Sequence, residues 1–228
     1  MKENQLVISE DGSHTLFSGE FKEHYHSTHG AIKESMHIFI RAGYDFVRPG
    51  LSEISLLEIG FGTGLNALLS CMESIENRLP ARYTALEPFP VSAECHQKLN
   101  FATQLEDPSA QRYLDKLHES GWGEEVEISE WFHITKIQTG IRELPLGTEQ
   151  YHLVYYDAFS PETQPEMWTE EVFEKLFTHL KPGGCLLTYS SKGIVKRALR
   201  AAGFRVYRLP GPPGKREILR AVKPEKSS

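Results

Sequence analysis

Residues 57–66 read LEIGFGTGLN, an apolar run followed by a glycine-rich loop. The loop places Gly60, Gly62 and Gly64 at two-residue spacing. Glycines at the end of a buried strand let the backbone approach a ligand closely. A dinucleotide-binding loop has its third glycine where this chain has Leu65, so the spacing favours a ligand without a pyrophosphate.

Strand and helix patterns alternate around this loop. A hairpin with an Asp11-Gly12 turn and a helix at 30–47 precede it. We predict strands at 55–59, 83–87, 132–138, 151–159, 185–190, 204–210 and 216–222. We predict further helices at 65–76, 91–100, 169–184 and 193–203, with a less regular helical insertion at 101–129.

This alternation predicts an α/β fold with a seven-stranded, mostly parallel sheet and helices on both faces. Residues 1–50 are expected to form a small N-terminal β-hairpin extension with one helix, packed on the core. Residues 51–228 then form the main domain. Ligands of such sheets bind at the carboxyl ends of the strands.

Composition is that of an ordinary soluble globular protein, with 39% hydrophobic and 25% charged residues among 228. No apolar run approaches the roughly 20 residues of a membrane helix, and the N-terminus lacks a signal-peptide core. The three cysteines are far apart, which argues against a disulfide framework or a structural zinc site. A reducing cytoplasm is the expected location.

Charge is unevenly distributed along the chain, whose net charge is -6. Residues 192–223 contain ten lysines and arginines and a single acid, Glu217, which gives this segment a net charge of +9. A basic end on an acidic body is typical of a protein that binds an anionic polymer at one place. A solvated helix face with a basic tail is the alternative. The candidate phosphate-binding residues are Lys192, Lys196, Arg197, Lys215 and Arg216.

Carboxylates flank the glycine loop. Glu87 ends the next strand, where it can accept hydrogen bonds from ribose hydroxyls, as an acid there does for NAD and for S-adenosylmethionine alike. Glu58, two residues before Gly60, would repel phosphates and suit a sulfonium or amino group. The alternative is a strand-to-helix turn in which the glycines serve geometry alone.

A second group follows the fourth predicted strand, in YYDAFSPETQPEMW at 155–168. Asp157 stands at the carboxyl end of that strand, followed by Phe159 and Pro161. If the reaction is methyl transfer to an amine, the amine must be neutral to attack the methyl group. A carboxylate can orient such an amine and take its proton. The ring of Phe159 or Trp168 can stack on a base or shelter the methyl group. Alternatively Asp157 caps a turn, and Trp168 and Met167 belong to the core.

Several motifs occur together in a fixed order. They are HYHSTHGAIKESMHIFI at 24–40, FGTGLN at 61–66, EPFP at 87–90, DAFSPETQPEMW at 157–168, SSKGIVKRAL at 190–199 and GPPGKREIL at 211–219. Together they cover nearly the whole chain. The sequence resembles the methyltransferase domain of the MnmC-type tRNA-modification enzymes and the stand-alone MnmD-like versions of that domain.

The resemblance implies a Rossmann-like S-adenosylmethionine-dependent methyltransferase fold. It implies methyl transfer to 5-aminomethyl-(2-thio)uridine at the wobble position of tRNA, which gives the methylaminomethyl nucleoside. By the resemblance, Lys215 and Arg216 lie near the tRNA and Asp157 faces the acceptor amine. The residues expected to contact the cofactor are Glu58, Gly60, Gly62, Gly64, Asn66, Glu87 and Asp157.

Two departures from the family pattern are visible. Bifunctional members carry a flavin-dependent oxidase after this domain, and this chain ends where the oxidase would begin. We therefore expect methylation alone, with an aminomethyl substrate made elsewhere. Family members also place an acid after the third strand to hold the adenine amino group. Gly140 stands at about that position, with Glu143 three residues on. Two explanations are open: backbone groups hold the adenine amino group, or the cofactor binds more weakly.

Other features of the sequence say less about function. His24, His26 and His29 have loop-like spacing without a completing cysteine or acid, so no metal is expected. Ser190 and Ser191 lack the surroundings of a hydrolase nucleophile. Two alternative functions are open: a methyltransferase for a small-molecule amine or another nucleobase, and a binding module on a degenerate methyltransferase fold. The basic segment favours tRNA over the first, and the intact glycine loop argues against the second.

Overall fold

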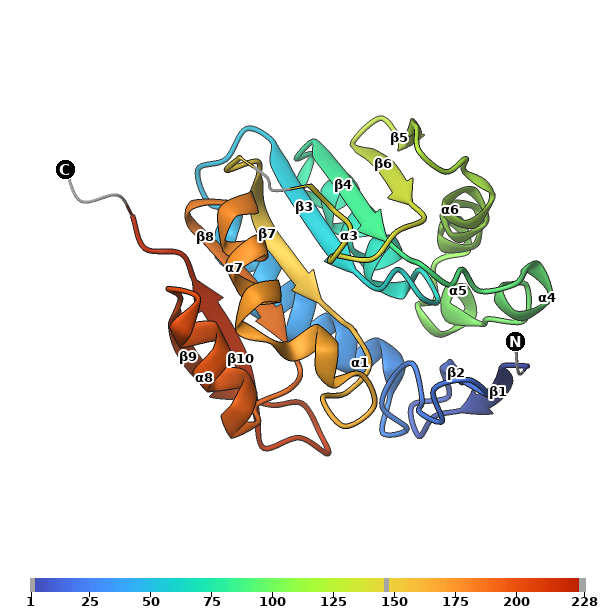
Figure 1. Ribbon diagram of the computed structural model, residues 1–228. Coiled ribbons are helices and arrows are strands. Elements are labelled where there is room, and N and C mark those ends of the chain that lie inside the picture. The colour runs from blue at the N-terminus through green and yellow to red at the C-terminus, as the bar shows by residue number, and fades with distance from the viewer. Residues whose placement is uncertain (1–2, 146–147, 226–228) are drawn as a thin grey trace.

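The computed structural model describes residues 3–145 and 148–225 and has one large mixed sheet at its centre (Figure 1). Its strands are β3 (Ile54–Ile59), β4 (Ala81–Leu86), β5 (Glu125–Ser129), β6 (Phe132–Ile137), β7 (Tyr151–Tyr156), β8 (Leu180–Thr188), β9 (Arg205–Pro210) and β10 (Glu217–Val222). The order across the sheet is β5-β6-β4-β3-β7-β8-β10-β9. The central strands β6, β4, β3, β7 and β8 are parallel. The predicted parallel α/β fold is confirmed.

The sheet has one strand more than the sequence predicts. Strand β5 lies in the segment expected to be an irregular insertion, and it pairs antiparallel with the edge of β6. Its sequence, EVEIS, buries only Ile128, because the strand is at the edge and mostly faces solvent. A pattern with so few apolar residues gives a weak strand signal. The insertion also contains two helices, α5 (Phe101–Gln104) and α6 (Pro108–Glu119).

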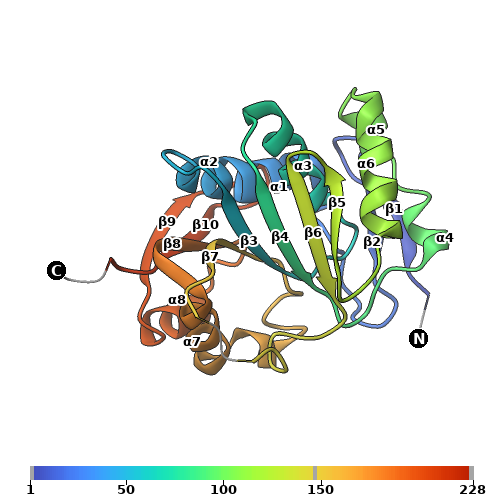
Figure 2. The ribbon, with the colours of Figure 1, turned by 90° about the horizontal axis from the view of Figure 1, so that it is seen from above.

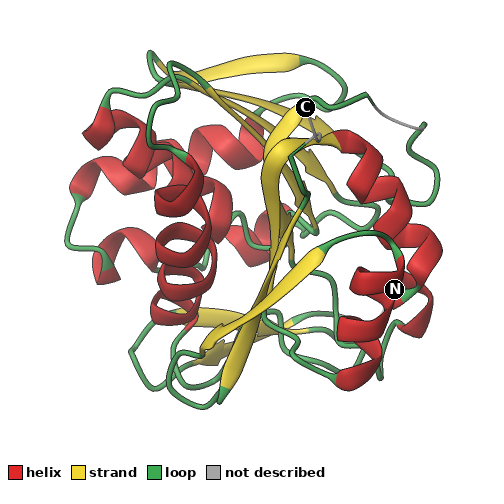
Figure 3. Ribbon diagram, turned by 90° about the vertical axis from the view of Figure 1, so that its left-hand side faces the viewer, coloured by secondary structure: helices red, strands yellow, loops and turns green. Residues whose placement is uncertain are grey.

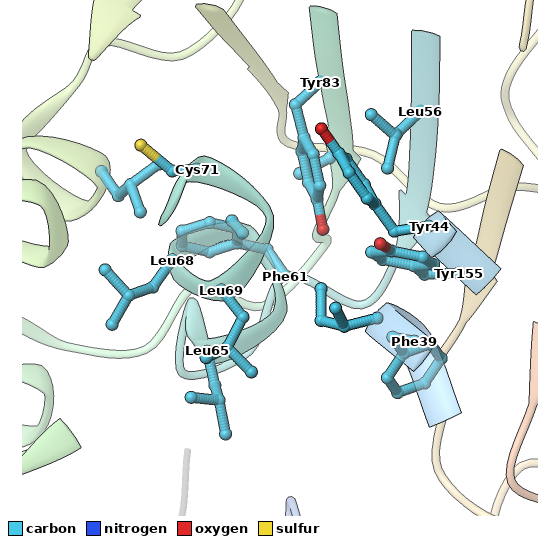
Figure 4. Close-up of a cluster of buried hydrophobic side chains, with 14 of the residues drawn as sticks. Phe39, Tyr44, Leu56, Phe61, Leu65, Leu68, Leu69, Cys71, Tyr83 and Tyr155 are labelled. Carbon is cyan, nitrogen blue, oxygen red and sulfur yellow. The ribbon is translucent and has the colours of Figure 1, made fainter. Parts of the chain in front are cut away.

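Helices cover both faces of the sheet (Figures 2 and 3). One face carries α3 (Leu65–Asn77) and an N-terminal helix made of α1 (Ala31–Ser35), the π-helical run η1 (Met36–Tyr44) and α2 (Asp45–Val47). The other face carries α7 (Glu170–His179) and α8 (Gly193–Ala201). On the first face Phe39, Tyr44, Tyr83 and Tyr155 pack together with Leu56 (Figure 4). Burial on both faces explains why β3 and β7 are nearly continuous apolar runs.

Two predicted helices are shorter than expected. The helix predicted at 91–100 is reduced to α4 (Ala93–His96), because the chain turns to place the Lys98 carbonyl 2.7 Å from His14 Nδ1. Helix α7 ends at His179, and the following Lys-Pro-Gly-Gly is extended within β8. Proline cannot continue a helix, and the Gly183 N–H donates instead to the Lys223 carbonyl at 2.9 Å.

The first residues form a separate two-stranded sheet of β1 (Gln5–Ile8) and β2 (His14–Phe17). Its turn contains Gly12 with a φ of +81°, a conformation that glycine adopts without strain. Asn100 ties the hairpin to the main body, since its side chain accepts from the His14 N–H and donates to the Gly12 carbonyl. Residues 18–29 then run to the carboxyl ends of β3 and β7, where Tyr25 meets the glycine loop.

Candidate active site

A cavity of about 450 Å³ opens at the carboxyl ends of the parallel strands. This is the edge where an open α/β sheet places its ligands. Parts of the chain that are far apart in sequence form its wall: residues 21, 23–29, 34, 59–63, 65–66, 86–89, 139–141, 157–159, 164, 167, 189 and 214–215.

Among the described residues, no helix is long and apolar enough to cross a bilayer.

The glycine loop is shaped by close approaches that a side chain would block. A Cβ on Gly60 would lie 2.9 Å from the Asp157 carbonyl oxygen, and one on Gly62 would lie 3.0 Å from Tyr25 Cδ1. Their φ values are +91° and +50°, which other residues adopt only with strain. Gly64 lies off the cavity and instead begins α3 in the left-handed conformation.

Glu87 lies in the cavity wall with its carboxylate held by the backbone. Its Oε2 accepts the Gly62 N–H at 3.0 Å, and its Oε1 accepts the Phe89 N–H at 2.8 Å. Burial raises the pKa of this carboxyl, while both backbone hydrogen bonds act in the opposite direction. A carboxylate has about four lone-pair positions, so two are left for ligand hydroxyls. The group therefore fits a ribose, in a loop that brings backbone close to it.

Glu58 does not lie where the sequence places it. The side chain is completely buried on the sheet face that also carries Tyr83 and Tyr155, and it is outside the cavity wall. Burial raises its pKa well above the usual range, and the negative charge of Asp157 adds to this shift. The expected contact with a ligand is corrected: alternation along β3 turns Glu58 into the core while the loop after Ile59 faces the cavity.

Asp157 follows β7 directly and faces the cavity. Its Oδ2 accepts a hydrogen bond of 2.9 Å from the Asn66 amide, so two of the predicted site residues meet here. Burial raises the pKa of Asp157 to about 7, with the nearby Glu34 charge acting in the same direction. The Asn66 hydrogen bond and the Lys215 ammonium oppose that shift. Near neutral pH this carboxyl can both accept and release a proton.

Aromatic rings line the cavity beside Asp157. Phe159 stacks on Phe21 with ring centres 4.7 Å apart, and Tyr25 meets the Phe159 ring edge-on at 5.1 Å. Phe89 lies 5.8 Å from Phe21 and is 52% exposed. Sequence reasoning found Phe159 but missed Phe21, Tyr25 and Phe89. The quoted EPFP and HYHSTH motifs contain two of them, yet only the folded chain brings these motifs to Phe159.

Trp168 lies in the core and is hydrogen-bonded to Phe159, one of the aromatic residues that line the cavity. The ring is 2% exposed and packs on Tyr156 and Phe173, while its Nε1–H donates to the Phe159 carbonyl at 2.8 Å. The expectation that Trp168 faces the acceptor is therefore corrected, since Pro165–Trp168 form a short 3₁₀ turn, η2, that directs the ring into the core. Pro161 is also outside the cavity wall, in the loop that Glu23 holds through Ser160.

Replacing Trp168 should therefore affect stability first. We expect Trp168→Phe to lower the free energy of unfolding by about 1–3 kcal/mol, because it removes buried volume and the bond to Phe159. Denaturant unfolding measures this, and the same replacement at the half-buried Trp131 should cost less. An unchanged free energy for Trp168→Phe would mean that the ring has no packing role.

The basic segment does not form one patch. Lys223 is buried and donates to the carbonyls of Phe177 and Leu180, and Arg220 lies over the ring of Phe46. Of the five predicted phosphate contacts, all within the described residues, only Lys215 lines the cavity. Lys192 pairs with Glu162, Lys196 is half-buried, and Arg197 and Arg216 are exposed.

A carboxylate is present beside Gly140 in spite of the missing side chain there. Gly140 lines the cavity, and a Cβ built on it would lie 2.7 Å from Glu143 Oε2. The Glu143 side chain thus folds back over the residue where the family pattern expects an acid. The turn from Gly140 to Glu143, closed by a 3.3 Å backbone hydrogen bond, brings them together.

The histidines line the cavity separately rather than as a cluster. His26 Nε2 lies 2.7 Å from Thr63 Oγ1, and burial lowers its pKa to about 4. His29 Nδ1 lies 3.0 Å from Glu10 Oε1. Within residues 3–145 and 148–225, no group of three or more His, Cys, Asp or Glu side chains is arranged to hold a metal ion.

The parallel sheet, the glycine loop after β3, the acid after β4 and the carboxylate after β7 define a Rossmann-like nucleotide-cofactor enzyme. Residues 108–224 match the family described as S-adenosyl-L-methionine-dependent methyltransferase. The chain belongs to this family, and its cofactor is S-adenosylmethionine.

Two proteins of known name are similar to this chain in sequence. The chain is 29% identical over 225 residues to the tRNA 5-methylaminomethyl-2-thiouridine biosynthesis bifunctional protein MnmC of Cupriavidus metallidurans, covering 93% of this chain and 33% of that protein. It is 31% identical over 219 residues to the protein of the same name from Pseudomonas syringae, covering 90% and 32%. The chain thus spans about a third of these relatives.

A solved structure agrees in fold. MNMC2 from Aquifex aeolicus superposes with a TM-score of 0.78 at 23% identity, covering all of this chain and 73% of that one. At this identity the agreement concerns the fold, which includes the arrangement of the sheet and its helices.

Proposed function

We propose that this chain methylates the primary amine of 5-aminomethyl-(2-thio)uridine at the wobble position of tRNA, in the cytoplasm. One observation carries the proposal. A buried carboxyl whose pKa is about 7, Asp157, faces the same cavity as the glycine loop and Glu87. Such a group suits an acceptor that must lose a proton before it reacts. The names of the relatives support tRNA as the substrate.

We expect the cofactor to bind in the part of the cavity formed by the glycine loop and Glu87. Gly60 and Gly62 line the cavity in a loop that packs closely on Asp157 and Tyr25, and Glu87 has lone pairs for the ribose hydroxyls of the cofactor. We expect the adenine near Gly140 in the cavity wall, where the carboxylate of Glu143, which is exposed and outside that wall, is the nearby acid. When bound, S-adenosylmethionine supplies a methyl group activated by its positively charged sulfur.

Asp157 handles the proton of the acceptor. The aminomethyl group is mostly an ammonium ion near neutral pH, with no lone pair for attack. Asp157 takes one proton from it, which frees the nitrogen lone pair. That lone pair would form the new bond to the methyl carbon while the sulfur–methyl bond breaks, its electron pair staying on sulfur to leave a neutral thioether. Asn66 holds the carboxylate in place through its 2.9 Å hydrogen bond. The methylated product leaves as a secondary ammonium, and Asp157 returns its proton to solvent.

The aromatic rings suit the uracil base. Phe159 and Phe21 stack on one another beside Asp157, and the exposed Phe89 ring continues the apolar surface toward solvent. A base taken out of the anticodon loop gains about 1–3 kcal/mol by stacking on such a ring. The rings therefore favour a nucleoside over a small aliphatic amine.

The tRNA backbone should contact exposed cations at the same edge of the sheet. Helix α8 begins where β8 ends, and Arg197 folds back toward its first residue, Gly193. Arg216 is in the neighbouring loop between β9 and β10. The acidic remainder of the protein should direct the tRNA toward these cations.

Salt dependence tests this partner. We expect Arg197→Ala combined with Arg216→Ala to weaken tRNA binding and to reduce the slope of log affinity against log salt by about 1–2, because each phosphate contact releases counterions. Arg82→Ala is the control, since Arg82 lies near the start of β4, at the opposite edge of the sheet, and pairs with Glu53 and Glu125. Unchanged affinity and slope in the double variant would favour a small-molecule amine as the substrate.

A further inference from the structure

The Lys215 ammonium lies inside the cavity, away from the exposed cations. Its Nζ is 2.8 Å from Glu34 Oε1 and 5.2 Å from the centre of the Tyr189 ring. Both partners line the same cavity as Asp157. A carboxylate and an aromatic face each attract an ammonium ion, the first by a charge-assisted hydrogen bond and the second by its ring quadrupole. A positively charged amine therefore has a formed binding place here.

A backbone hydrogen bond holds the carboxylate of Glu34 in place. It is 9% exposed, and its Oε2 accepts the Ser27 N–H at 2.8 Å. Its Oε1 faces Lys215, but within the described residues it receives no hydrogen bond of good direction. A buried carboxylate is costly unless it is paired, so this oxygen needs a cation. The contact with Lys215 supplies the charge but leaves hydrogen-bonding capacity unused.

The Lys215 side chain can leave without a change of fold. It belongs to the tight Gly-Pro-Pro-Gly turn between β9 and β10, closed by a 2.9 Å bond from the Lys215 N–H to the Pro212 carbonyl. The backbone is thereby fixed, whereas the side chain is a flexible four-carbon stem and is 28% exposed. Rotation about its side-chain bonds is enough to move the ammonium to solvent or to a phosphate.

We propose that Glu34 and the Tyr189 ring form the subsite for the ammonium group of the substrate, and that Lys215 fills this subsite until the substrate amine displaces it. The proposal rests on the proposed function for the identity of the amine. Glu34 binds the arriving ammonium beside Asp157, which then takes its proton. Glu34 is thus a specificity residue: it attracts an aminomethyl group and repels a side chain that carries a carboxylate at the same position.

The test uses the nucleoside 5-aminomethyluridine, which has no phosphate for the exposed cations to bind. Lys215→Met keeps the length of the side chain and removes its charge. We expect calorimetry to show about tenfold tighter binding of this nucleoside to Lys215→Met than to the unaltered protein, because the competing ammonium is gone. Adding Glu34→Gln should remove that gain, while Gln keeps an oxygen for the Ser27 N–H.

The uncharged nucleoside 5-hydroxymethyluridine is the control, and its affinity should be equal in all three proteins. Unchanged or weaker 5-aminomethyluridine binding to Lys215→Met would overturn the proposal, and so would a gain that survives Glu34→Gln. If the double variant does not fold, Lys215→Met alone decides. Because neither tRNA nor methyl transfer enters this measurement, a protein that binds the amine but leaves tRNA unmethylated would refute the proposed function and not this subsite.

Discussion

Asp157→Asn is expected to lower the rate of methyl transfer by about 100-fold to 10,000-fold, the usual contribution of a general base. Asparagine has nearly the same shape and keeps an oxygen for the Asn66 amide, which donates to Oδ2 at 2.9 Å. It cannot take a proton from the acceptor ammonium. Cofactor affinity should change little, since the loop at Gly60 and Gly62 and the Glu87 carboxylate are untouched. Single-turnover rates and calorimetry with S-adenosylmethionine measure the two effects separately.

A matched change outside the cavity controls for this variant. Asp45→Asn removes a carboxylate that pairs with Arg41 and Arg48 on the N-terminal helix, and it should leave the rate unaltered. If Asp157→Asn retains more than about half of the rate, Asp157 is a structural residue and the proposed chemistry is wrong.

The same chemistry predicts the direction of the pH dependence. Asp157 must be ionised to take a proton, and its pKa is raised to about 7 by burial and by Glu34. The rate should therefore fall as the pH drops below about 7 and the carboxyl becomes protonated. Lys215 and Asn66 oppose the shift in the pKa of Asp157. The charge of Asp157 in turn helps to raise the pKa of the buried Glu58 carboxyl. Asp157→Asn should lose this acidic limb.

Gly62→Val should abolish measurable cofactor binding, with a loss of more than about 100-fold, or about 2.7 kcal/mol. The new Cβ would lie 3.0 Å from the Tyr25 ring in a φ of +50°, so the ring or the loop, both part of the cavity wall, has to shift. The Gly62 N–H also holds Glu87 Oε2, so a shifted loop releases the carboxylate meant for the ribose. Calorimetry with S-adenosylmethionine measures the loss.

Backbone strain alone must be separated from this effect. Gly50 has a φ of +82°, and a Cβ built there meets nothing within 4 Å. Gly50→Val therefore suffers similar strain, about 1–2 kcal/mol in stability, without touching the cavity. It should bind the cofactor normally. Full cofactor affinity in a folded Gly62→Val protein would contradict the assignment of the loop.

The sequence predicted those features that depend on position within one element. Apolar runs that end in glycine or acid mark the carboxyl ends of parallel strands, and these ends meet at one edge of a sheet. That rule placed Glu87 and Asp157 on one cavity, together with the loop at Gly60 and Gly62. The family assignment rested on motifs whose order the fold preserves.

The remaining features depend on how distant segments close over one another. Glu34 reads as a polar position on an amphipathic helix, and nothing nearby in sequence shows that Lys215 reaches it. Glu58 and Trp168 stand beside ligand-facing residues, yet one strand alternation and one short 3₁₀ turn direct them into the core. Glu143 folds back beside Gly140 through a turn that spacing alone does not specify.

The most direct test is the product of the reaction itself. Purified protein is incubated with S-adenosylmethionine and with tRNA that carries 5-aminomethyluridine at the wobble position, and the nucleosides are then identified by mass spectrometry. The account predicts a single added methyl group on the side-chain nitrogen of that uridine, and far less of this product from Asp157→Asn after the same incubation time. Methylation of another nucleoside, or of a free small-molecule amine while the tRNA stays unchanged, would contradict the account.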